Sequence, residues 1–491
     1  MKKTLLILLF YPAFLFSQNQ ANNWFFGDSL MLNFNDGVIT AEQLFSENLI
    51  MMKEASASIS DAEGNLLFYT DGKYVWNKLH QVMENGCCML IGKYYDLFAS
   101  GITQGVVILP SPASENNFYI FVIGEENFYY SLVDMTANDG LGAVVEGKKN
   151  VELISDTYFF EKMHAVKHAN GRDWWLLVHE KLAPIPDDST NTFFRFLITP
   201  EGISDPYIHN AGTKWGDVAT SGQMLFSPQG DRLVFPQENY FEVFDFDRCE
   251  GLLSNPIKIT LEDDNFKSYG LSFSPDGSKV YISSVREDGE ILQYCFNCEV
   301  PLADTEKLIY FLPGNNYVIG QHQLANDGKI YVSIVYNSGG YHENFSVENM
   351  NLCVINNPNE EGLACDFDTS TIWLGGRRVI CGLPNFANYS LGALVGSECD
   401  TLDVSINNTI HKNEITLYPN PATDHLFINT NNIHYASLII HITDAAGKNI
   451  LAQNITSNNT KINITQLSKG IYFVSIKQDA EVVFKESFVK Q

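Results

Sequence analysis

Residues 271–283 read Leu-Ser-Phe-Ser-Pro-Asp-Gly-Ser-Lys-Val-Tyr-Ile-Ser, and this stretch predicts a β-hairpin. Apolar residues alternate with serines before the turn, and the same period of two resumes after it. Pro275 presets φ for the first central position of a tight turn, and Gly277 can take a positive φ that β-branched residues avoid. The stretch therefore predicts two antiparallel strands joined by residues 274–277.

Comparable turns recur along the large N-terminal part of the chain. Their spacing of roughly fifty residues matches four-stranded propeller blades and predicts an all-β fold, a β-propeller of about seven blades. Residues 351–356 or 371–374, combined with strands of residues 24–34, would complete the seventh blade. A β-sandwich array is the structural alternative. The other predicted strand pairs are at residues 56–70, 105–123, 164–179, 223–236 and 323–333.

The composition indicates large packed cores and excludes some partners. The chain has 491 residues, of which 45% are hydrophobic and 13% aromatic, so it is not a disordered protein. Its 31 basic residues are outnumbered by 58 acidic ones, which gives a formal net charge of -27. Such a charge repels nucleic-acid phosphates and anionic membrane surfaces. We therefore expect no nucleic-acid partner, and we attribute the acidity to the solubility of a secreted protein rather than to cation binding.

Residues 1–17 have the organisation of a secretory signal peptide. Lys2 and Lys3 precede an apolar run over residues 5–16, and Ser17 and polar residues follow it. A membrane anchor would need about 20 apolar residues, and this run is shorter. The residue after the proposed cleavage point at Ser17 is Gln18 rather than a cysteine, which disfavours a lipoprotein, and no other segment is long and apolar enough to be a transmembrane segment.

The composition changes abruptly after Cys399, where asparagine, threonine, isoleucine and lysine replace large aromatics. Residues 18–399 are predicted to form the propeller domain, residues 400–414 a linker, and residues 415–491 a second domain. The short strands and turn signals of this last segment predict a compact immunoglobulin-like β-sandwich. The strands are predicted at residues 415–418, 425–429, 437–444, 461–465, 471–477 and 482–489.

The C-terminal segment also carries three short motifs in a fixed order. Their residues are Leu417, Tyr418, Pro419, Asn420, Pro421 and Ala422, then Asp444 and Gly447, then Leu467, Gly470, Ile471, Tyr472, Phe473 and Val474. Together they resemble the type A sorting domain of the type IX secretion system, a bacterial route across the outer membrane. The resemblance implies recognition by the secretion machinery, usually followed by cleavage and by release of the cargo or its attachment to surface lipopolysaccharide. An ordinary accessory sandwich is the alternative. The residues expected to form the sorting signal are Tyr418, Pro419, Asn420, Pro421, Asp444, Gly447, Gly470 and Tyr472.

The large domain resembles a group of exported propeller-like proteins that often carry such sorting domains. The stretches that carry the resemblance are Ala57 to Asn77, Ser272 to Gly277, Asp327 to Val332 and Gly382 to Phe386. The resemblance implies a WD40-like or TolB-like propeller. It implies no catalytic residue, because propellers support many unrelated functions.

The nine cysteines are scattered through the large domain, and none of their spacings is that of a zinc ribbon. Cys295 and Cys298 form a CxxC motif, but a redox motif would open a helix after a strand, and this one follows the end of a strand. In an exported chain we favour one or two disulfides. The pairs considered are Cys249 with Cys295 or Cys298, and Cys353 with Cys365.

The sequence contains no GxSxG elbow, HExxH motif, Walker loop or dinucleotide glycine fingerprint, the motifs of familiar hydrolases and nucleotide enzymes. The densest candidate is the histidine group His164, His168 and His179, in which the first two would share one face of a strand. His168 falls at a predicted turn, however, and Trp174 and Trp175 are expected to pack between blades.

Several acidic and aromatic residues are weaker candidates. Asp245 and Asp247 alternate along a strand, which leaves a structural calcium ion open, although such acids more often cap turns. The acidic pairs are candidates for paired catalytic carboxylates, and the tyrosines for stacking on sugars. We expect the acids in solvated loops and the tyrosines in packed blades instead, so we assign no catalytic, cofactor-binding or metal-ligating residue. The remaining candidates are Glu125, Glu126, Asp263, Asp264, Tyr129, Tyr130, Tyr336 and Tyr341.

Two functions from different classes fit the sequence. The first is a secreted or cell-surface binding and adhesion module, exported through the type IX machinery, with a glycan or protein ligand at the loop-bearing face of the ring. The second is a secreted hydrolase or lyase that acts on extracellular polysaccharide or protein at the propeller channel. The second predicts that chemistry-bearing side chains converge at the channel. These side chains are His164, Asp61, Asp217 and His322.

Overall fold

The computed structural model describes most of the chain. The described residues are 19–35, 40–43, 51–89, 101–124, 126–181, 189–215, 221–261, 266–285, 288–314, 317–336, 345–400, 415–430, 438–443, 449–455, 457–478 and 481–491. The chain divides into two compact units, Met1–Asp400 and Thr401–Gln491, and each is described by itself. The expected signal peptide, residues 1–17, lies outside the described residues, and so do residues 401–414 of the expected linker.

The N-terminal unit contains seven antiparallel sheets among its described residues, each built from one continuous stretch of chain. The first three sheets comprise β1 (Asn23–Asp28), β2 (Leu30–Asn33), β3 (Thr40–Gln43) and β4 (Met51–Met52); β5 (Ala57–Ser60), β6 (Leu66–Thr70) and β7 (Val75–Asn77); and β8 (Val106–Pro110), β9 (Asn117–Ile123), β10 (Phe128–Asp134), β11 (Ala143–Val144) and β12 (Val151–Ile154). The next two comprise β13 (Tyr158–Lys167), β14 (Trp174–Lys181), β15 (Thr190–Thr199), β16 (Gly202–Ile203) and β17 (Tyr207–Trp215); and β18 (Leu225–Phe226), β19 (Arg232–Pro236), β20 (Tyr240–Asp247) and β21 (Leu252–Thr260). The last two comprise β22 (Ser268–Phe273), β23 (Lys279–Ser284), β24 (Gly289–Cys295) and β25 (Lys307–Leu312); and β26 (Tyr317–Leu324), β27 (Ile330–Tyr336), β28 (Asn351–Ile355) and β29 (Phe367–Trp373). Short 3₁₀ helices are η1 (Asn19–Ala21), η3 (Asn138–Gly140), η4 (Leu302–Thr305) and η5 (Gly362–Cys365).

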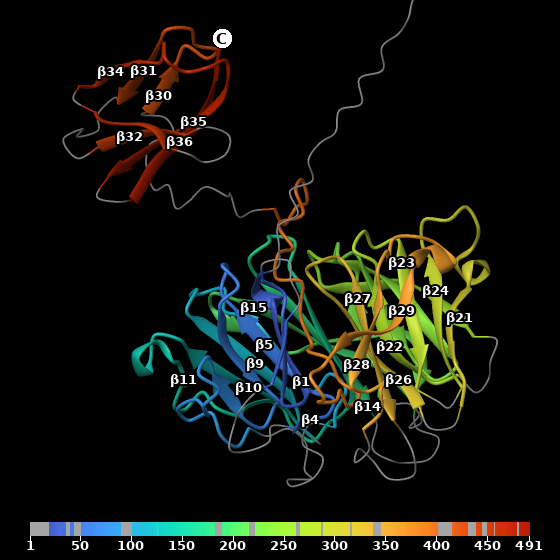
Figure 1. The fold of residues 1–491 in the computed structure, drawn as a ribbon. Helices are drawn as coiled ribbons and strands as arrows, with labels where there is room; N and C mark the ends of the chain where they lie inside the picture. The colour runs from blue at the N-terminus through green and yellow to red at the C-terminus, as the bar shows by residue number, and fades with distance from the viewer. Residues whose placement is uncertain are drawn as a thin grey trace, which may run out of the picture. The chain divides into compact units, whose positions relative to one another are not determined.

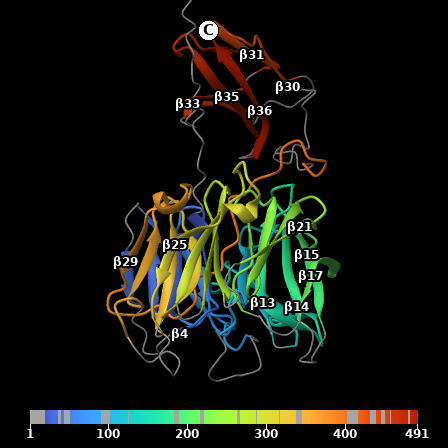
Figure 2. The same cartoon turned by 90° about the vertical axis from the view of Figure 1, so that its right-hand side faces the viewer.

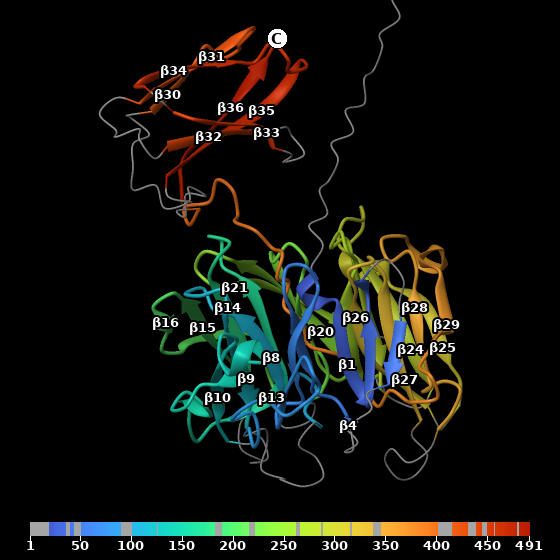
Figure 3. The ribbon, with the colours of Figure 1, turned by 60° about the vertical axis from the view of Figure 1, so that its left-hand side comes forward.

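The sheets follow one another around a ring, so the unit is a β-propeller of seven blades (Figures 1, 2 and 3). Consecutive blades are in contact through β1 and β5, β5 and β8, β8 and β13, β13 and β18, β19 and β22, and β22 and β26. The ring closes between the first and last blades, where the rings of Trp24 and Tyr331 meet edge to face with centroids 5.5 Å apart. Closure in a ring leaves no open end to the array of sheets.

The hairpin at residues 271–283 forms as expected, from β22 and β23. Leu271 pairs with Ile282, and the N–H of Gly277, which has a φ of 69°, donates to Ser274 O at 2.9 Å. Every residue of both strands is buried. The alternation therefore separates large apolar side chains from small polar ones rather than core from solvent, because β22 packs between neighbouring blades.

The other five expected strand pairs are confirmed as β5–β6, β8–β9, β13–β14, β18–β19 and β26–β27. The expected composition of the seventh blade is wrong. Strands β28 and β29 complete the sheet begun by β26 and β27, and β1 and β2 form their own sheet with β3 and β4. The end of the propeller unit still contributes to the first blade, because Asp28 N donates to Arg378 O at 3.0 Å.

The disulfides also differ from the expected pairs. Cys249 bonds to Cys399, and Cys295 bonds to Cys298. The adjacent Cys87 and Cys88 are bonded to each other as well. Cys353, Cys365 and Cys381 are free. The chain path brings the end of the propeller unit back to Cys249, a relationship that sequence spacing does not reveal.

The C-terminal unit is a two-sheet sandwich, as expected. One sheet is β30-β31-β34 and the other β33-β32-β35-β36. Alternate residues such as Leu438, Ile440 and Ile442 point into a core shared by both sheets. The strand β33 was not expected, because half of its six residues are polar and it follows a turn signal. The strands are β30 (Ile415–Tyr418), β31 (His425–Thr430), β32 (Leu438–Thr443), β33 (Asn449–Asn454), β34 (Asn459–Asn463), β35 (Gly470–Gln478) and β36 (Glu481–Lys490).

No helix in the described part of the chain is long and apolar enough to cross a membrane.

Candidate functional site

The centre of the ring is occupied by the chain's own residues 378–392. The N–H of Cys381 donates to Lys53 O at 3.0 Å, beside the first blade. Further along, the Asn385 side chain donates to one carbonyl of β8 and one of β13, each at 3.1 Å. The Tyr389 hydroxyl donates to another β8 carbonyl at 2.9 Å. Because this central segment contacts inner strands on different sides of the ring, it fills the middle of the propeller with protein.

Buried glutamines tie the inner strands together across the centre. Gln104 bonds both backbone groups of Met224, donating at 3.1 Å and accepting at 2.8 Å. Gln223 bonds both backbone groups of His322 in the same way, at 2.9 Å each. Gln321 donates to a carbonyl just before β8 at 2.8 Å. A primary amide offers a donor and an acceptor side by side, so each glutamine replaces a backbone partner that neighbouring inner strands cannot supply.

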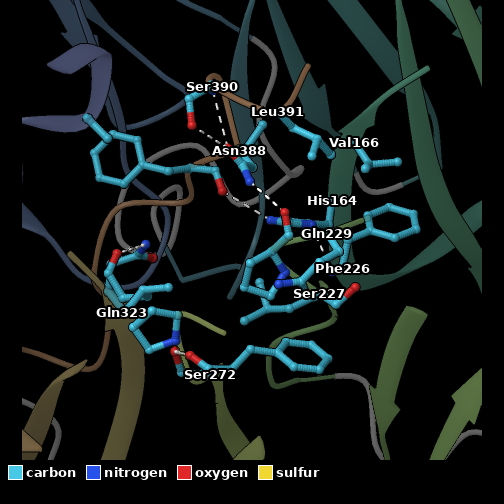
Figure 4. Close-up of a pocket in the computed structure, with 18 of the residues that line it drawn as sticks. His164, Val166, Phe226, Ser227, Gln229, Ser272, Gln323, Asn388, Ser390 and Leu391 are labelled. Carbon is cyan, nitrogen blue, oxygen red and sulfur yellow. Dashed lines mark hydrogen bonds between the residues drawn. The ribbon is translucent and has the colours of Figure 1, made fainter. Parts of the chain in front are cut away.

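A cavity of about 450 Å³ lies where the central segment emerges at one mouth of the ring (Figure 4). Its walls are the carboxyl ends of the inner strands β13, β18, β22 and β26, the hairpin turns that follow them, and residues 386–392. This volume falls within the range of roughly 300–1,000 Å³ typical of small-molecule sites. Its lining, as far as the chain is described, contains no Asp, Glu, Lys or Arg. We call it the mouth pocket.

The imidazole of His164 forms part of the wall of the mouth pocket and is fixed as a neutral ring (Figure 4). Its Nδ1 accepts the N–H of Phe226 at 3.2 Å, so its Nε2 carries the hydrogen and donates to Phe386 O at 3.0 Å. Burial lowers the pKa of His164 to about 4. Both nitrogens are engaged by backbone groups, so this histidine positions the pocket wall and has no nitrogen left for proton transfer.

The rim of the mouth pocket is a chain of hydrogen bonds between turns of different blades. The Asn388 side chain donates to Pro228 O at 2.8 Å, and the Gln229 side chain donates to Asp276 O at 3.0 Å. The N–H of Asp276 in turn donates to the side chain of Asn359 at 3.3 Å. Bonds of this kind hold the hairpin turns at fixed separations, so the opening is formed before any ligand arrives.

An acidic pair lies at the opposite mouth, around the amino ends of the inner strands. Thr103 Oγ1 is 3.2 Å from Glu54 Oε2 and 3.0 Å from Glu161 Oε2, and it also accepts the N–H of Gly222 at 3.1 Å. The Tyr269 hydroxyl donates to the same Glu54 oxygen at 3.0 Å. A hydroxyl has one hydrogen and donates to one carboxylate only. Both contacts are satisfied when the second carboxyl keeps its proton and donates to Thr103.

The surroundings explain how one proton is retained. Burial, followed by the nearby charge of Glu161, raises the pKa of Glu54 to about 8. Burial also raises the pKa of Glu161. The fully buried Lys162 lies next to the pair in sequence and donates to Ser221 O at 2.7 Å, and burial lowers its pKa to about 7. One signal for this site is visible in the sequence: Glu161 and Lys162 lie inside an otherwise largely apolar strand.

The expected histidine group does not assemble. His168 bonds to Cys249 O at 3.0 Å at the turn, and His179 is packed between the rings of Phe193 and Phe235. As expected, Trp174 and Trp175 are buried, in two different core clusters. No group of three His, Cys, Asp or Glu side chains suited to a metal ion occurs among the described residues.

The four side chains expected at a catalytic channel also remain apart where they are described. Asp61 caps its own turn by accepting the N–H groups of Glu63 and Asn65. His322 is fully buried beside Gly270 between blades, and His164 lies at the mouth pocket. Asp217 lies outside the described residues. The inner strands converge on a path filled by the central segment, and the three described members of the quartet form no common site there.

The remaining candidates have structural roles where the structure describes them. Asp247 caps a turn by accepting the N–H of Cys249 at 2.7 Å, and Asp245 accepts the side chain of Asn255 at 2.8 Å. Glu126 accepts the hydroxyl of Tyr158 at 2.5 Å. The tyrosines Tyr129, Tyr130 and Tyr336 are half-buried. Four candidates lie outside the described residues: Glu125, Asp263, Asp264 and Tyr341.

In the C-terminal unit, part of the expected sorting signal is gathered around the last strand. The Asn420 side chain accepts the N–H of Val489 at 3.0 Å, and the ring of Tyr472 stacks on Phe488 with centroids 5.7 Å apart. Tyr418 is 41% exposed. Pro419 and Pro421 flank Asn420, Gly470 begins β35, and Asp444 and Gly447 lie outside the described residues.

Residues 416–491 match the family described as the secretion system C-terminal sorting domain. The chain ends in a type IX sorting domain. This sorting domain implies an interaction with the type IX secretion machinery and export to the cell surface or the medium. The sequence matches no curated protein.

Several solved structures are similar to the chain at low identity. A putative 6-phosphogluconolactonase from Bacteroides fragilis is 12% identical, with 65% of this chain and 88% of that chain covered and a TM-score of 0.36. The β-propeller domain of Cps50 (Swd1) from Myceliophteria thermophila is 12% identical, with 64% and 93% covered and a TM-score of 0.36. Hsv2p from Kluyveromyces lactis is 11% identical, with 67% and 86% covered and a TM-score of 0.34. No activity follows from similarity at this level.

Proposed function

We propose that the protein is a secreted or cell-surface binding module, whose propeller holds a ligand in the mouth pocket and whose sorting domain directs it out of the cell. We further propose that residues 1–17 are a signal peptide, that residues 400–414 link the domains, and that the expected motif residues form the sorting signal. The observation that carries the binding role is the preformed, uncharged pocket of about 450 Å³ with a hydrogen-bonded rim.

The chemistry of the mouth pocket favours recognition over catalysis. Among the described lining residues the polar side chains are amides and hydroxyls, and the one histidine spends both nitrogens on backbone groups. General acid-base catalysis needs a side chain that exchanges a proton near the working pH. A ring packed at its centre also keeps the pocket walls fixed, which reduces the entropy lost when a ligand binds.

The test is ligand binding by the full chain, measured on arrays of extracellular glycans and proteins. Gly392→Phe is the blocking variant, because Gly392 lines the pocket and a Cβ added there meets no atom within 4 Å. Gln81→Phe, at an exposed residue that does not line the pocket, is the matched control. Binding that is lost in Gly392→Phe and kept in Gln81→Phe supports the proposal. Absence of any binding that depends on the pocket refutes it.

The acidic pair supports a second candidate function, a secreted hydrolase acting on extracellular polysaccharide or protein. Glu54 and Glu161 differ in their contacts, and one carboxyl keeps a proton near neutral pH, as a general acid must. This site lies at the mouth opposite the pocket. If it is catalytic, Glu54→Gln and Glu161→Gln abolish depolymerisation of a polymer that the native protein degrades. No depolymerisation by the native protein on a broad polymer panel removes this candidate.

A further inference from the structure

We infer that the ligand of the mouth pocket is an uncharged carbohydrate, recognised through its hydroxyl groups by Gln229 and Gln323. The inference rests on the proposed binding role of this pocket and names the class of ligand. Three properties of the pocket carry it: the charge of its lining, the hydrogen-bonding groups left over at its walls, and the apolar surface between them.

The lining excludes a strongly charged ligand. Moving an ionised group from water into a pocket without a counter-charge carries the large free-energy penalty of burying an unpaired charge. The described lining carries no acidic or basic side chain that would supply this counter-charge. The net charge of -27 adds a repulsive field against anions such as sulfated or uronic polymers. A neutral ligand avoids both costs.

The two glutamines provide the hydrogen bonds that a neutral sugar needs. Gln229 donates one side-chain hydrogen to Asp276 O at 3.0 Å, and Gln323 donates one to Leu324 O at 3.0 Å. Among the described residues no donor contacts the Oε1 atom of either side chain, and each amide has a second hydrogen. Gln323 therefore presents one donor and one acceptor to the pocket, and Gln229 presents one donor, because its Oε1 lies against Gly277, where an added Cβ would be 2.1 Å away. A pair of neighbouring hydroxyls, each both donor and acceptor, matches that arrangement.

Apolar side chains separate these amides. Leu225, Leu324 and Leu391 line the pocket and are half-buried, so part of each faces the cavity. Figure 4 shows Leu391 at the pocket wall. The C–H faces of a pyranose ring are apolar and bury against such surface, while its edge carries the hydroxyls. A peptide would leave backbone groups unpaired against these leucines, because buried N–H and C=O groups need partners. The alternation of leucine and amide therefore favours a sugar over a peptide.

The test is isothermal titration of the full chain with neutral oligosaccharides, with sulfated and uronic oligosaccharides, and with peptides. We expect binding of a neutral oligosaccharide that Gln229→Leu and Gln323→Leu each weaken by roughly tenfold or more, since each removes at least one hydrogen bond. Gln81→Leu, at an exposed residue outside the pocket, should leave the affinity unchanged. We also expect the affinity to change less than about twofold between about 0.05 and 0.5 M NaCl, because no charge takes part.

Each of the other outcomes overturns a specific part of the proposal. Binding of an anionic oligosaccharide or of a peptide that Gly392→Phe abolishes overturns the carbohydrate class and leaves the binding role intact. Neutral-sugar binding that both glutamine variants retain overturns the assignment of these two residues. Thermal unfolding of each variant separates loss of the ligand from loss of the fold, since Gln229 also bonds to the neighbouring turn. Absence of pocket-dependent binding to all three ligand classes overturns the proposed function itself.

Discussion

Glu54 and Glu161, which enter the ring in different blades, are joined through a single hydroxyl: Thr103 Oγ1 lies 3.2 Å from one carboxyl and 3.0 Å from the other. The ring brings together residues far apart in sequence. Because the threonine hydroxyl has only one hydrogen to donate, both contacts require that one of the two carboxyls keeps a proton. The pair is surrounded by Tyr269 and Lys53 as well, so its titration responds to several neighbours.

The first prediction concerns the pH dependence of this pair. The pKa of Glu54 is raised from 4.5 to about 8, so the folded state holds a proton that the unfolded chain releases between these values. The stability of the native protein relative to Glu54→Gln should therefore fall as pH rises from 4.5 to about 8, by at most about 1.4 kcal/mol per pH unit. Denaturant unfolding of both proteins at several pH values measures this difference. Parallel stability curves would show that Glu54 titrates normally.

A second prediction compares two buried histidines. His164 has partners for both nitrogens, whereas neither nitrogen of His322 has a partner among the described residues. His164→Leu leaves the N–H of Phe226 and the carbonyl of Phe386 unpaired and should cost about 2–3 kcal/mol. His322→Leu removes an unpaired polar ring and should change the free energy of unfolding by less than about 1 kcal/mol at neutral pH.

The buried His322 should also make the stability of the protein depend on pH in the acidic range. The pKa of His322 is lowered from 6.5 to about 3 by burial, so the unfolded chain takes up a proton that the folded chain refuses. Native stability should fall as pH drops from 6.5 towards 3, and His322→Leu should lose less stability over this range. A greater loss at neutral pH for His322→Leu than for His164→Leu would contradict the account.

The hairpins were predictable because their determinants are local. Pro275 and Gly277 specify the turn within four residues, and alternation specifies the strands around it. The closing contact between Asp28 and Arg378 was not predictable, because residues 378–392 form no regular strand and carry no periodic pattern. The partner of Cys249 was missed for the same reason, since the irregular segment after residue 378 brings Cys399 back beside Cys249.

Neither the mouth pocket nor the acidic pair was predictable from the sequence. Sequence reasoning placed chemistry on histidines and loop acids, and overlooked Glu54, Thr103 and Glu161, whose contacts depend on three different blades meeting at the ring centre. Likewise Gln229 follows a proline in an ordinary turn and becomes a pocket residue only when four blades converge. Convergence of this kind depends on the arrangement of blades, which no single stretch encodes.

A third prediction concerns the disulfides of the propeller. Cys249 and Cys399 are separated by 150 residues, whereas Cys295 and Cys298 are separated by 3. By loop-closure entropy, the long bridge should contribute about 5 kcal/mol and the short one about 2 kcal/mol. Cys249→Ser with Cys399→Ser should therefore lower the free energy of unfolding more than Cys295→Ser with Cys298→Ser. Denaturant unfolding of the two double variants measures this, and equal losses would show that loop entropy does not govern them.

The last prediction concerns export. Gly470 begins β35, and a Cβ added there meets only the ring of Tyr472 at 3.9 Å, so a larger residue fits without displacing the strand. If Gly470 belongs to the sorting signal, Gly470→Val should trap the protein in the periplasm, as we also expect for deletion of residues 416–491, while thermal unfolding of the sorting domain stays unchanged. Lys469→Val, at the preceding exposed residue, is the matched control and should still be exported. Cell fractionation measures the outcome. Export of Gly470→Val at the native level, with the deletion trapped, would place the signal elsewhere in the sorting domain.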